Sequence, residues 1–211
     1  MPWGPEDWDT LTQEEQPRGT GTPSEEQALL LNLKKIPGRQ RMTVADLGCG
    51  RGELLPFLKS HFRHVVAIDH AAASLARARE ACHGKAVTFR RRDLRDLTPF
   101  RGAFHVALAV DSILGPRLSD VDRILDQIHR SLVEGGILLA TFQAAPRGGK
   151  PRALPLRDER TEVRTPLILS EAEVQYHIRR AGFRGVSVRR LAKERGFRDR
   201  LLAIATRRAN N

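Results

Sequence analysis

Cysteine is scarce in this chain of 211 residues, and long apolar runs are missing. The two cysteines, Cys49 and Cys82, exclude a disulfide framework, and without a nearby paired histidine they do not make a usual zinc site. No apolar run approaches the roughly 20 residues that a membrane span needs. The acidic start MPWGPEDWDT also lacks the layout of a signal peptide. We therefore expect a cytoplasmic protein with no membrane span.

Aromatic residues and lysine are also few, with 2 Trp and 1 Tyr, whereas arginine is abundant and the net charge is +11. The charge is uneven: it is −4 over residues 1–36, +5 over 37–146 and +10 over 147–211. A basic final third could attract nucleic acid or an anionic substrate. However, its arginines have no interleaved aromatics for base stacking. A general bias towards Arg, Ala and Gly explains the charge equally well.

The length fits one domain. Residues 1–23 are rich in Pro, Gly and acids and show no period, so they resemble a tail or flap. A helix is predicted over 24–35, where Ser24 and Gln27 form a capping box. We therefore divide the chain into an N-terminal flap and helix, 1–36, and a main domain, 37–211.

From residue 43 onwards, apolar strand-like runs alternate with helix-like runs. Strands are predicted over 43–48, 64–69, 86–91, 104–110 and 136–142, and helices over 52–62, 72–82 and 119–132. Nearly continuous apolar strands between helices indicate a parallel sheet that is covered on both faces.

The pattern changes after the fifth predicted strand. Residues 143–169 are rich in Pro, Gly and Arg, and then Ser170 and Glu173 form a second capping box that opens a helix over 171–182. Two strands, 185–191 and 200–206, follow closely enough to pair antiparallel. The expected fold is an α/β open sheet of about seven strands, mostly parallel with an antiparallel last strand, with helices on both faces.

The stretch VADLGCGRGELL, 44–55, is the main candidate for a binding site. Gly48, Gly50 and Gly52 lie between a strand and a helix, where an open α/β sheet places its ligand. The dinucleotide pattern G-x-G-x-x-G is not met, because the third glycine comes one residue early. Asp46 would be poorly placed beside a pyrophosphate, but it could hold a cationic amino group or orient water. The pattern therefore disfavours a dehydrogenase.

The segment VADLGCGRG resembles the first motif of the class I S-adenosylmethionine-dependent methyltransferases, which have a Rossmann-like fold. VVAIDHAAASLARARE, VTFRRRDLRDL and FHVALAVDSILG look like the second, third and fourth motifs, and RSLVEGGILLATF has the Gly-Gly turn before the fifth strand. LILSEAEVQYHIRRAGF resembles the late helix of the small-molecule branch. The resemblance covers roughly residues 40–206.

This resemblance implies S-adenosylmethionine as the cofactor, with S-adenosylhomocysteine as the product. It implies that Asp69 accepts hydrogen bonds from the ribose hydroxyls and that Asp93 and Leu94 contact the adenine. Gly48 and Gly50 would flank the methionine part. The implied cofactor-binding set is Asp46, Gly48, Cys49, Gly50, Asp69, His70, Asp93, Leu94 and Val110. Cys49 is interpreted as a small neutral filler rather than a nucleophile, and an exposed loop position explains His70 equally well.

Asp111 is the candidate catalytic residue, because the resemblance places it near the transferred methyl group. It could position or deprotonate an acceptor hydroxyl or amine, and a capping or cofactor-contacting role stays open. The sequence Asp111-Ser112-Ile113-Leu114 lacks the Pro-Pro-aromatic run of base-amino methyltransferases and the Pro-Cys pair of the cytosine-carbon type. Phe142-Gln143 replaces the acids of the metal-dependent type, so no metal is expected.

The predicted function is methyl transfer (EC 2.1.1.-) to an oxygen or nitrogen of a small molecule. An RNA methyltransferase that uses the basic final third, or a non-catalytic cofactor-binding protein of the same fold, stays open as an alternative.

Segments 1–23 and 143–169 are expected to enclose the acceptor, the first with Trp3 and Trp8. Arginines of the second segment could hold an acidic acceptor: Arg147, Arg152, Arg157, Arg160 and Arg164. Tyr176 is expected to pack, and His129 and His177 are expected at the surface or the core edge. The oligomeric state is not set.

Overall fold

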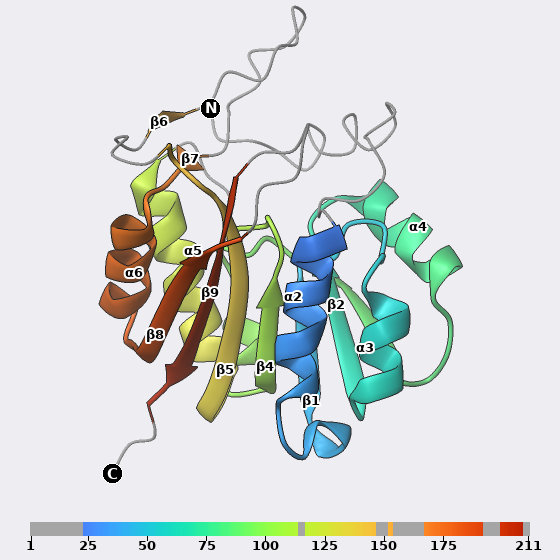
Figure 1. Ribbon diagram of the computed structural model, residues 1–211. Coiled ribbons are helices and arrows are strands. Elements are labelled where there is room, and N and C mark those ends of the chain that lie inside the picture. Colours follow the sequence, from blue (N-terminus) through green and yellow to red (C-terminus); the bar gives the residue numbers. More distant parts are fainter. Residues whose placement is uncertain (1–22, 114–116, 147–151, 154–166, 192–198, 209–211) are drawn as a thin grey trace, which may run out of the picture.

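A seven-stranded sheet with helices on both faces organises the protein (Figure 1). The computed structural model describes residues 23–113, 117–146, 152–153, 167–191 and 199–208. The sheet strands are β1 (Thr43–Leu47), β2 (His64–Asp69), β3 (Val87–Arg91), β4 (Phe104–Ala109), β5 (Leu132–Gln143), β8 (Phe183–Arg190) and β9 (Arg200–Arg207). The α-helices are α2 (Pro23–Lys34), α3 (Leu55–His61), α4 (Ala72–Ala81), α5 (Leu118–Ser131) and α6 (Glu171–Arg180).

The strand order is β3-β2-β1-β4-β5-β9-β8. The pairs β1–β2, β2–β3, β1–β4 and β4–β5 are parallel, and β9 runs antiparallel to both β5 and β8. The predicted fold is therefore confirmed, including the antiparallel last strand. Short pieces complete the architecture: the 3-10 turns η1 (Arg39–Arg41) and η2 (Thr98–Phe100) and the small pair β6 (Arg152–Ala153) and β7 (Leu167–Ile168).

Each face of the sheet has its own apolar core, because successive strand residues point to opposite sides. In β4, Ala107 and Ala109 belong to one core, while Val106 and Leu108 belong to the other. Helices α5 and α6 cover the first core, and α2, α3 and α4 cover the second (Figure 1). None of the helices in the described part of the chain is both long and apolar enough to cross a membrane.

The N-terminal helix is part of this packing. Leu29 and Leu33 of α2 and the following Ile36 are buried in the same core as Val44 of β1. The described part of the 1–36 segment thus packs on the main domain. Residues 1–22 and the side chains of the predicted Ser24–Gln27 capping box lie outside what the structure describes.

Two predicted boundaries differ from the structure by three residues or more. The helix expected from residue 52 begins at Leu55, because Gly52 adopts a φ of +86° and a turn in which Leu55 N donates to Gly52 O precedes the helix. Strand β5 begins at Leu132 instead of residue 136, with a register irregularity between Phe104 and Val106 of its partner β4.

Helix α6 begins as predicted but is rotated differently from our expectation. Ser170 and Glu173 form the expected capping box, in which Ser170 Oγ accepts from Glu173 N at 3.3 Å and Glu173 Oε2 accepts from Ser170 N at 2.7 Å. The predictions for Tyr176 and His177 were wrong: Tyr176 is 61% exposed, whereas His177 is buried. Its Nδ1 lies 2.6 Å from Asp122 Oδ1, so a polar contact with α5 brings His177 inwards.

Candidate functional site

The glycine turn after β1 lies at the carboxyl edge of the sheet, and the chain continues from it through α3 to β2. Strand β1 lies between β2 and β4, and such a switch point is where open α/β sheets bind ligands. Gly48, Gly50 and Gly52 all have positive φ, at +73°, +54° and +86°. Gly48 N and Cys49 N both donate to Ile68 O, at 2.7 and 3.0 Å, which fixes the turn against β2.

Two of the glycines are required by neighbouring protein atoms. A Cβ at Gly48 would lie 2.4 Å from Ser112 Cβ, and one at Gly52 would lie 3.1 Å from Ala78 Cβ of α4. At Gly50 the nearest atom would be Glu53 Oε2, at 3.7 Å, so positive φ is the main constraint there. The glycine pattern that indicated a ligand thus also serves close packing between β1, β4 and α4.

Asp69, the last residue of β2, links the two turns that follow β1 and β2. Its Oδ2 accepts from Gly50 N and its Oδ1 accepts from Ala71 N, both at 2.9 Å. The residue is buried, and burial raises the pKa of Asp69, while the two N–H groups and the neighbouring His70 act in the opposite direction. His70 Nδ1 lies 3.7 Å from Asp69 Oδ1. The structure therefore brings together Asp69, His70 and Gly50, three residues of the predicted cofactor-binding set.

Asp46, in β1, is a second buried carboxyl group beside Asp69. Burial, together with the charges of Asp69 and Glu53, raises the pKa of Asp46 to about 7. Glu53 was not predicted as a site residue; it joins this group because the turn brings its carboxylate to Gly50. Carboxylates that disfavour one another in a buried site are stabilised by a bound cation. This corner of the molecule is therefore suited to a positively charged ligand.

Cys49 is not suited to act as a nucleophile. Its side chain is buried, and burial together with the charges of Asp46 and Asp69 raises the pKa of its thiol far above the ordinary value. The thiolate is the reactive form of cysteine, so this thiol stays protonated and inert. Its Sγ contacts Gly50 O at 3.8 Å within the turn.

Asp93 and Leu94 follow β3, the strand next to β2. Arg95 donates from Nε and Nη2 to Asp93 Oδ2, at 3.0 and 2.5 Å, and its main-chain N donates to Oδ1 at 2.8 Å. Burial alone would raise the pKa of Asp93, but the Arg95 contacts outweigh it and hold that pKa below the ordinary value. Leu94 is buried in the core. The pairing with Arg95 was not anticipated, although the two residues are only two apart.

Asp111 lies just beyond β4, after the partly buried Val110. Its Oδ2 accepts from Arg200 of β9, with distances of 2.8 Å to Nε and 2.7 Å to Nη2, and its Oδ1 accepts from Thr141 Oγ1 at 3.2 Å. The sequence analysis missed Arg200 and Thr141. A threonine inside the apolar run GILLATF is the one signal that pointed to a polar partner there.

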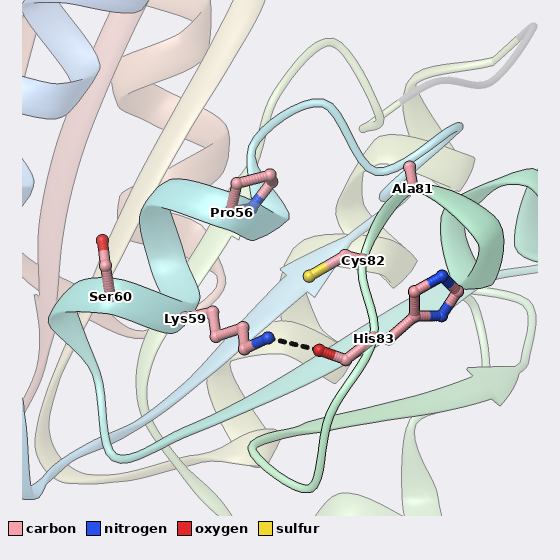
Figure 2. A pocket seen from close by; sticks show the side chains of 6 residues that line it. All are labelled: Pro56, Lys59, Ser60, Ala81, Cys82 and His83. Atoms are coloured by element: carbon pink, nitrogen blue, oxygen red, sulfur yellow. Dashed lines mark hydrogen bonds between the residues drawn. The ribbon is translucent and has the colours of Figure 1, made fainter.

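A hollow of about 420 Å³ lies away from this edge (Figure 2). It lies between α3 and the segment that follows α4, and its lining consists of Pro56, Lys59, Ser60, Ala81, Cys82 and His83. Lys59 Nζ donates to His83 O across it, as Figure 2 shows. These residues precede the amino ends of β2 and β3, so the hollow is not part of the candidate site. Within the described ranges, no three His, Cys, Asp or Glu side chains gather as metal ligands.

The expected acceptor enclosure falls largely outside the described residues. Trp3 and Trp8 lie there, as do Arg147, Arg157, Arg160 and Arg164 and the side chain of Arg152. The prediction that segments 1–23 and 143–169 enclose an acceptor therefore remains a prediction.

Comparison with known proteins agrees with the geometry. Residues 44–136 match the sequence profile of a family described as a methyltransferase domain. This match and the fold are consistent with the class I S-adenosylmethionine-dependent methyltransferases. This methyltransferase domain is matched from β1 to the start of β5, the part that carries the glycine turn, Asp69 and Asp93. S-adenosylmethionine is the cofactor that the assignment implies.

Several solved structures share the fold of this chain at low sequence identity. The 1,6-didemethyltoxoflavin-N1-methyltransferase of Burkholderia thailandensis is 19% identical, with a TM-score of 0.79, covering 97% of this chain and 87% of that one. The N-methyltransferase NodS of Bradyrhizobium japonicum is 15% identical, with a TM-score of 0.71 and coverage of 97% and 99%. A chain from a complex containing the Trm112 methyltransferase activator of Haloferax volcanii is 16% identical, with a TM-score of 0.75 and coverage of 96% and 98%. A search of curated protein sequences gave no match.

Gly48→Ala should destabilise this protein more than Gly135→Ala does. Both glycines have a φ of +73°, so the backbone strain is matched, but nothing lies within 4 Å of a Cβ at Gly135. The clash with Ser112 Cβ should lower the free energy of unfolding at Gly48 by about 1–3 kcal/mol more, as measured by urea denaturation. Adding Ser112→Gly should restore part of the loss. Equal effects of the two alanine variants would contradict this account.

Asp46→Asn should stabilise the ligand-free protein at pH 8 and change little near pH 4. Because the pKa of Asp46 is raised to about 7 from an ordinary value of 3.8, its contribution to stability is complete below about pH 4 and is lost as the pH rises through 7. Asparagine stays neutral, so the gain at pH 8 should be roughly 1–4 kcal/mol in urea denaturation. The control is Asp126→Asn, in an exposed pair with Arg130. A gain that is independent of pH would refute the argument.

Proposed function

We propose that the protein transfers a methyl group from S-adenosylmethionine to a nitrogen or oxygen of a small molecule. The observation that carries this proposal is the convergence of two buried carboxyl groups, Asp46 and Asp69, on the glycine turn at the carboxyl edge of the sheet. S-adenosylmethionine carries a cationic sulfonium and an amino group close to a ribose diol. A buried acidic corner beside the glycine turn suits both parts of that molecule.

In this proposal Asp69 accepts hydrogen bonds from the ribose hydroxyls, and Asp46 lies near the cationic amino-acid end. Gly48, Cys49 and Gly50 form the wall beside the methionine part, and His70 lies next to the ribose. Asp93, Leu94 and Val110 lie near the adenosine. The cofactor would supply an activated methyl group, and the residues of this chain would bind it and align the acceptor with the sulfur–methyl bond.

Small-molecule acceptors are favoured by two observations. Two of the fold neighbours are named as N-methyltransferases, one of them crystallised with bound 1,6-didemethyltoxoflavin. In addition, several arginines of the basic C-terminal third already have partners inside the protein. Arg180 contacts Asp122, Arg190 contacts Asp199, and Arg200 contacts Asp111. Arg207 donates to main-chain carbonyls at the end of α5. This leaves less charge for RNA phosphates than the composition suggested.

Loss of the Asp69 carboxylate should weaken cofactor binding. Asp69→Ala would leave the ribose hydroxyls unpaired, and the affinity for S-adenosylhomocysteine should fall by about 10- to 100-fold, equivalent to roughly 1–3 kcal/mol. Isothermal titration calorimetry measures this, and urea denaturation checks that the turn held by Asp69 still folds. Asp126→Ala, on the exposed side of α5, should bind like the wild type. Unchanged affinity in Asp69→Ala would exclude the ribose role, and tighter binding of a nicotinamide dinucleotide would exclude the cofactor.

The acceptor class is tested with methyl-labelled S-adenosylmethionine. The protein is incubated with a small-metabolite extract and, in parallel, with bulk tRNA and rRNA. Label in the small-molecule fraction supports the proposal, whereas label in RNA alone supports the RNA alternative. Binding of S-adenosylhomocysteine without transfer to either pool would identify a non-catalytic cofactor-binding protein. RNA binding should be weak and should decrease steeply with salt.

A further inference from the structure

Asp111, Thr141 and Arg200 form a polar cluster at the carboxyl edge, contributed by three neighbouring strands. Asp111 follows β4, Thr141 lies in β5, and Arg200 begins β9, 89 residues further along the chain than Asp111. The side chains of Asp111 and Arg200 are only 9% and 13% exposed. Both guanidinium contacts reach Asp111 Oδ2, and Thr141 Oγ1 donates to Oδ1 at the longer distance of 3.2 Å.

The backbone at Asp111 is strained. With a φ of +48°, it is the one non-glycine residue of the described ranges that has a positive φ. This conformation costs of order 1–3 kcal/mol, and such outliers gather at functional sites. Asp111 N donates to Thr141 Oγ1 at 2.9 Å, so the same hydroxyl binds both the main chain and the carboxylate of Asp111. The structure thus holds this residue in one orientation at an energetic cost.

The cluster lies directly beside the turn proposed to hold the methionine part of the cofactor. Ser112, the next residue, packs so closely on Gly48 that a Cβ added at Gly48 would clash with the Ser112 side chain. Ser112 Oγ is buried and has no hydrogen-bond partner in the described part of the chain. A buried hydroxyl without a partner is costly, which points to a polar group that arrives with a ligand. Asp111 and Ser112 therefore line the side of the turn that faces away from Asp69 and β2.

The charges around Asp111 determine what its carboxylate does. Burial raises the pKa of Asp111 above its ordinary value, because its effect outweighs the opposing effects of Arg200 from β9 and the Thr141 hydroxyl from β5. The glycine turn packed beside it presents Gly48, which carries no charge. A carboxylate paired with a guanidinium accepts hydrogen bonds well, and even with a raised pKa it is a weak base towards an alcohol. Asp111 is therefore poorly suited to an acceptor that must lose a proton before it reacts.

We propose that Arg200 is a positioning residue that holds the Asp111 carboxylate ready to accept a hydrogen bond from the acceptor, and that the acceptor group is a neutral amine. This inference rests on the proposed function. An amine can donate an N–H to Asp111 Oδ1 while its lone pair points at the methyl group. The N–C bond then forms from that lone pair, the C–S bond breaks with its electrons staying on sulfur, and the methylated ammonium releases its proton to solvent water.

The first experiment measures methyl transfer from labelled S-adenosylmethionine to matched aromatic amines and aromatic alcohols. Wild-type protein should label amines, and product analysis should find the methyl group on nitrogen. Arg200→Gln should lower kcat about 10- to 100-fold with S-adenosylhomocysteine affinity changed less than about 3-fold. Arg200→Lys should recover part of the rate, and Arg189→Gln on β8, an exposed arginine, should behave as wild type. Labelling of alcohols alone, or an Arg200→Gln rate equal to that of Arg189→Gln, would overturn the inference.

The second experiment does not need an acceptor. Protein labelled with 13C at the aspartate side-chain carboxyl is titrated by NMR, and the Asp111 signal is assigned with Asp111→Asn. Arg200→Gln, which removes the charge, should raise the pH at which Asp111 titrates by about one unit or more, and Arg200→Lys should raise it less. An unchanged titration would show that Arg200 does not hold Asp111 charged. If S-adenosylhomocysteine does not bind, the proposed function itself fails, whatever this titration shows.

Discussion

The hydrogen bonds from Gly50 N and Ala71 N to the Asp69 carboxylate are the interactions on which the rest of the site depends. They bind the turn after β1 to the turn after β2 at the edge where the strand order reverses. Without them the positive-φ turn at Gly48–Gly52 would lose its link to the second strand. Their electrostatic consequence is equally important, because they keep a carboxylate buried next to Asp46 and make that corner receptive to a cation.

The candidate site is electrostatically divided between its two ends. On the β2 side, Asp46, Asp69 and Glu53 lie together, and burial and the charges of Asp69 and Glu53 raise the pKa of Asp46. On the β4 side, Arg200 compensates the charge of Asp111. A cationic cofactor is therefore favoured at the first end, whereas the second end suits a neutral polar group. This division explains how one sheet edge can serve two chemically different ligands.

The local features could be predicted from the sequence, and the long-range ones could not. The glycine turn, Asp69 at the end of its strand and the Ser170–Glu173 capping box all depend on residues within a few positions of one another. The Asp111–Arg200 and Asp122–His177 contacts join residues 89 and 55 positions apart, and only the folded sheet brings them together. Tyr176 and His177 were misplaced because the polar partner on α5 decides which side of α6 is buried. The close packing of Gly48 on Ser112 could not be predicted either, because only the folded sheet brings these two residues together.

Proton release on binding S-adenosylmethionine tests the central claim most directly. At pH 6 to 7 Asp46 is largely protonated in the ligand-free protein, and a cation placed beside it should ionise it. Calorimetric titrations in two buffers of different ionisation enthalpy should therefore find up to about one proton released per cofactor bound, decreasing as the pH rises above 7. The Asp46→Asn variant should release none. Binding with no proton release in the wild type, or with equal release in the variant, would contradict the account of the acidic corner.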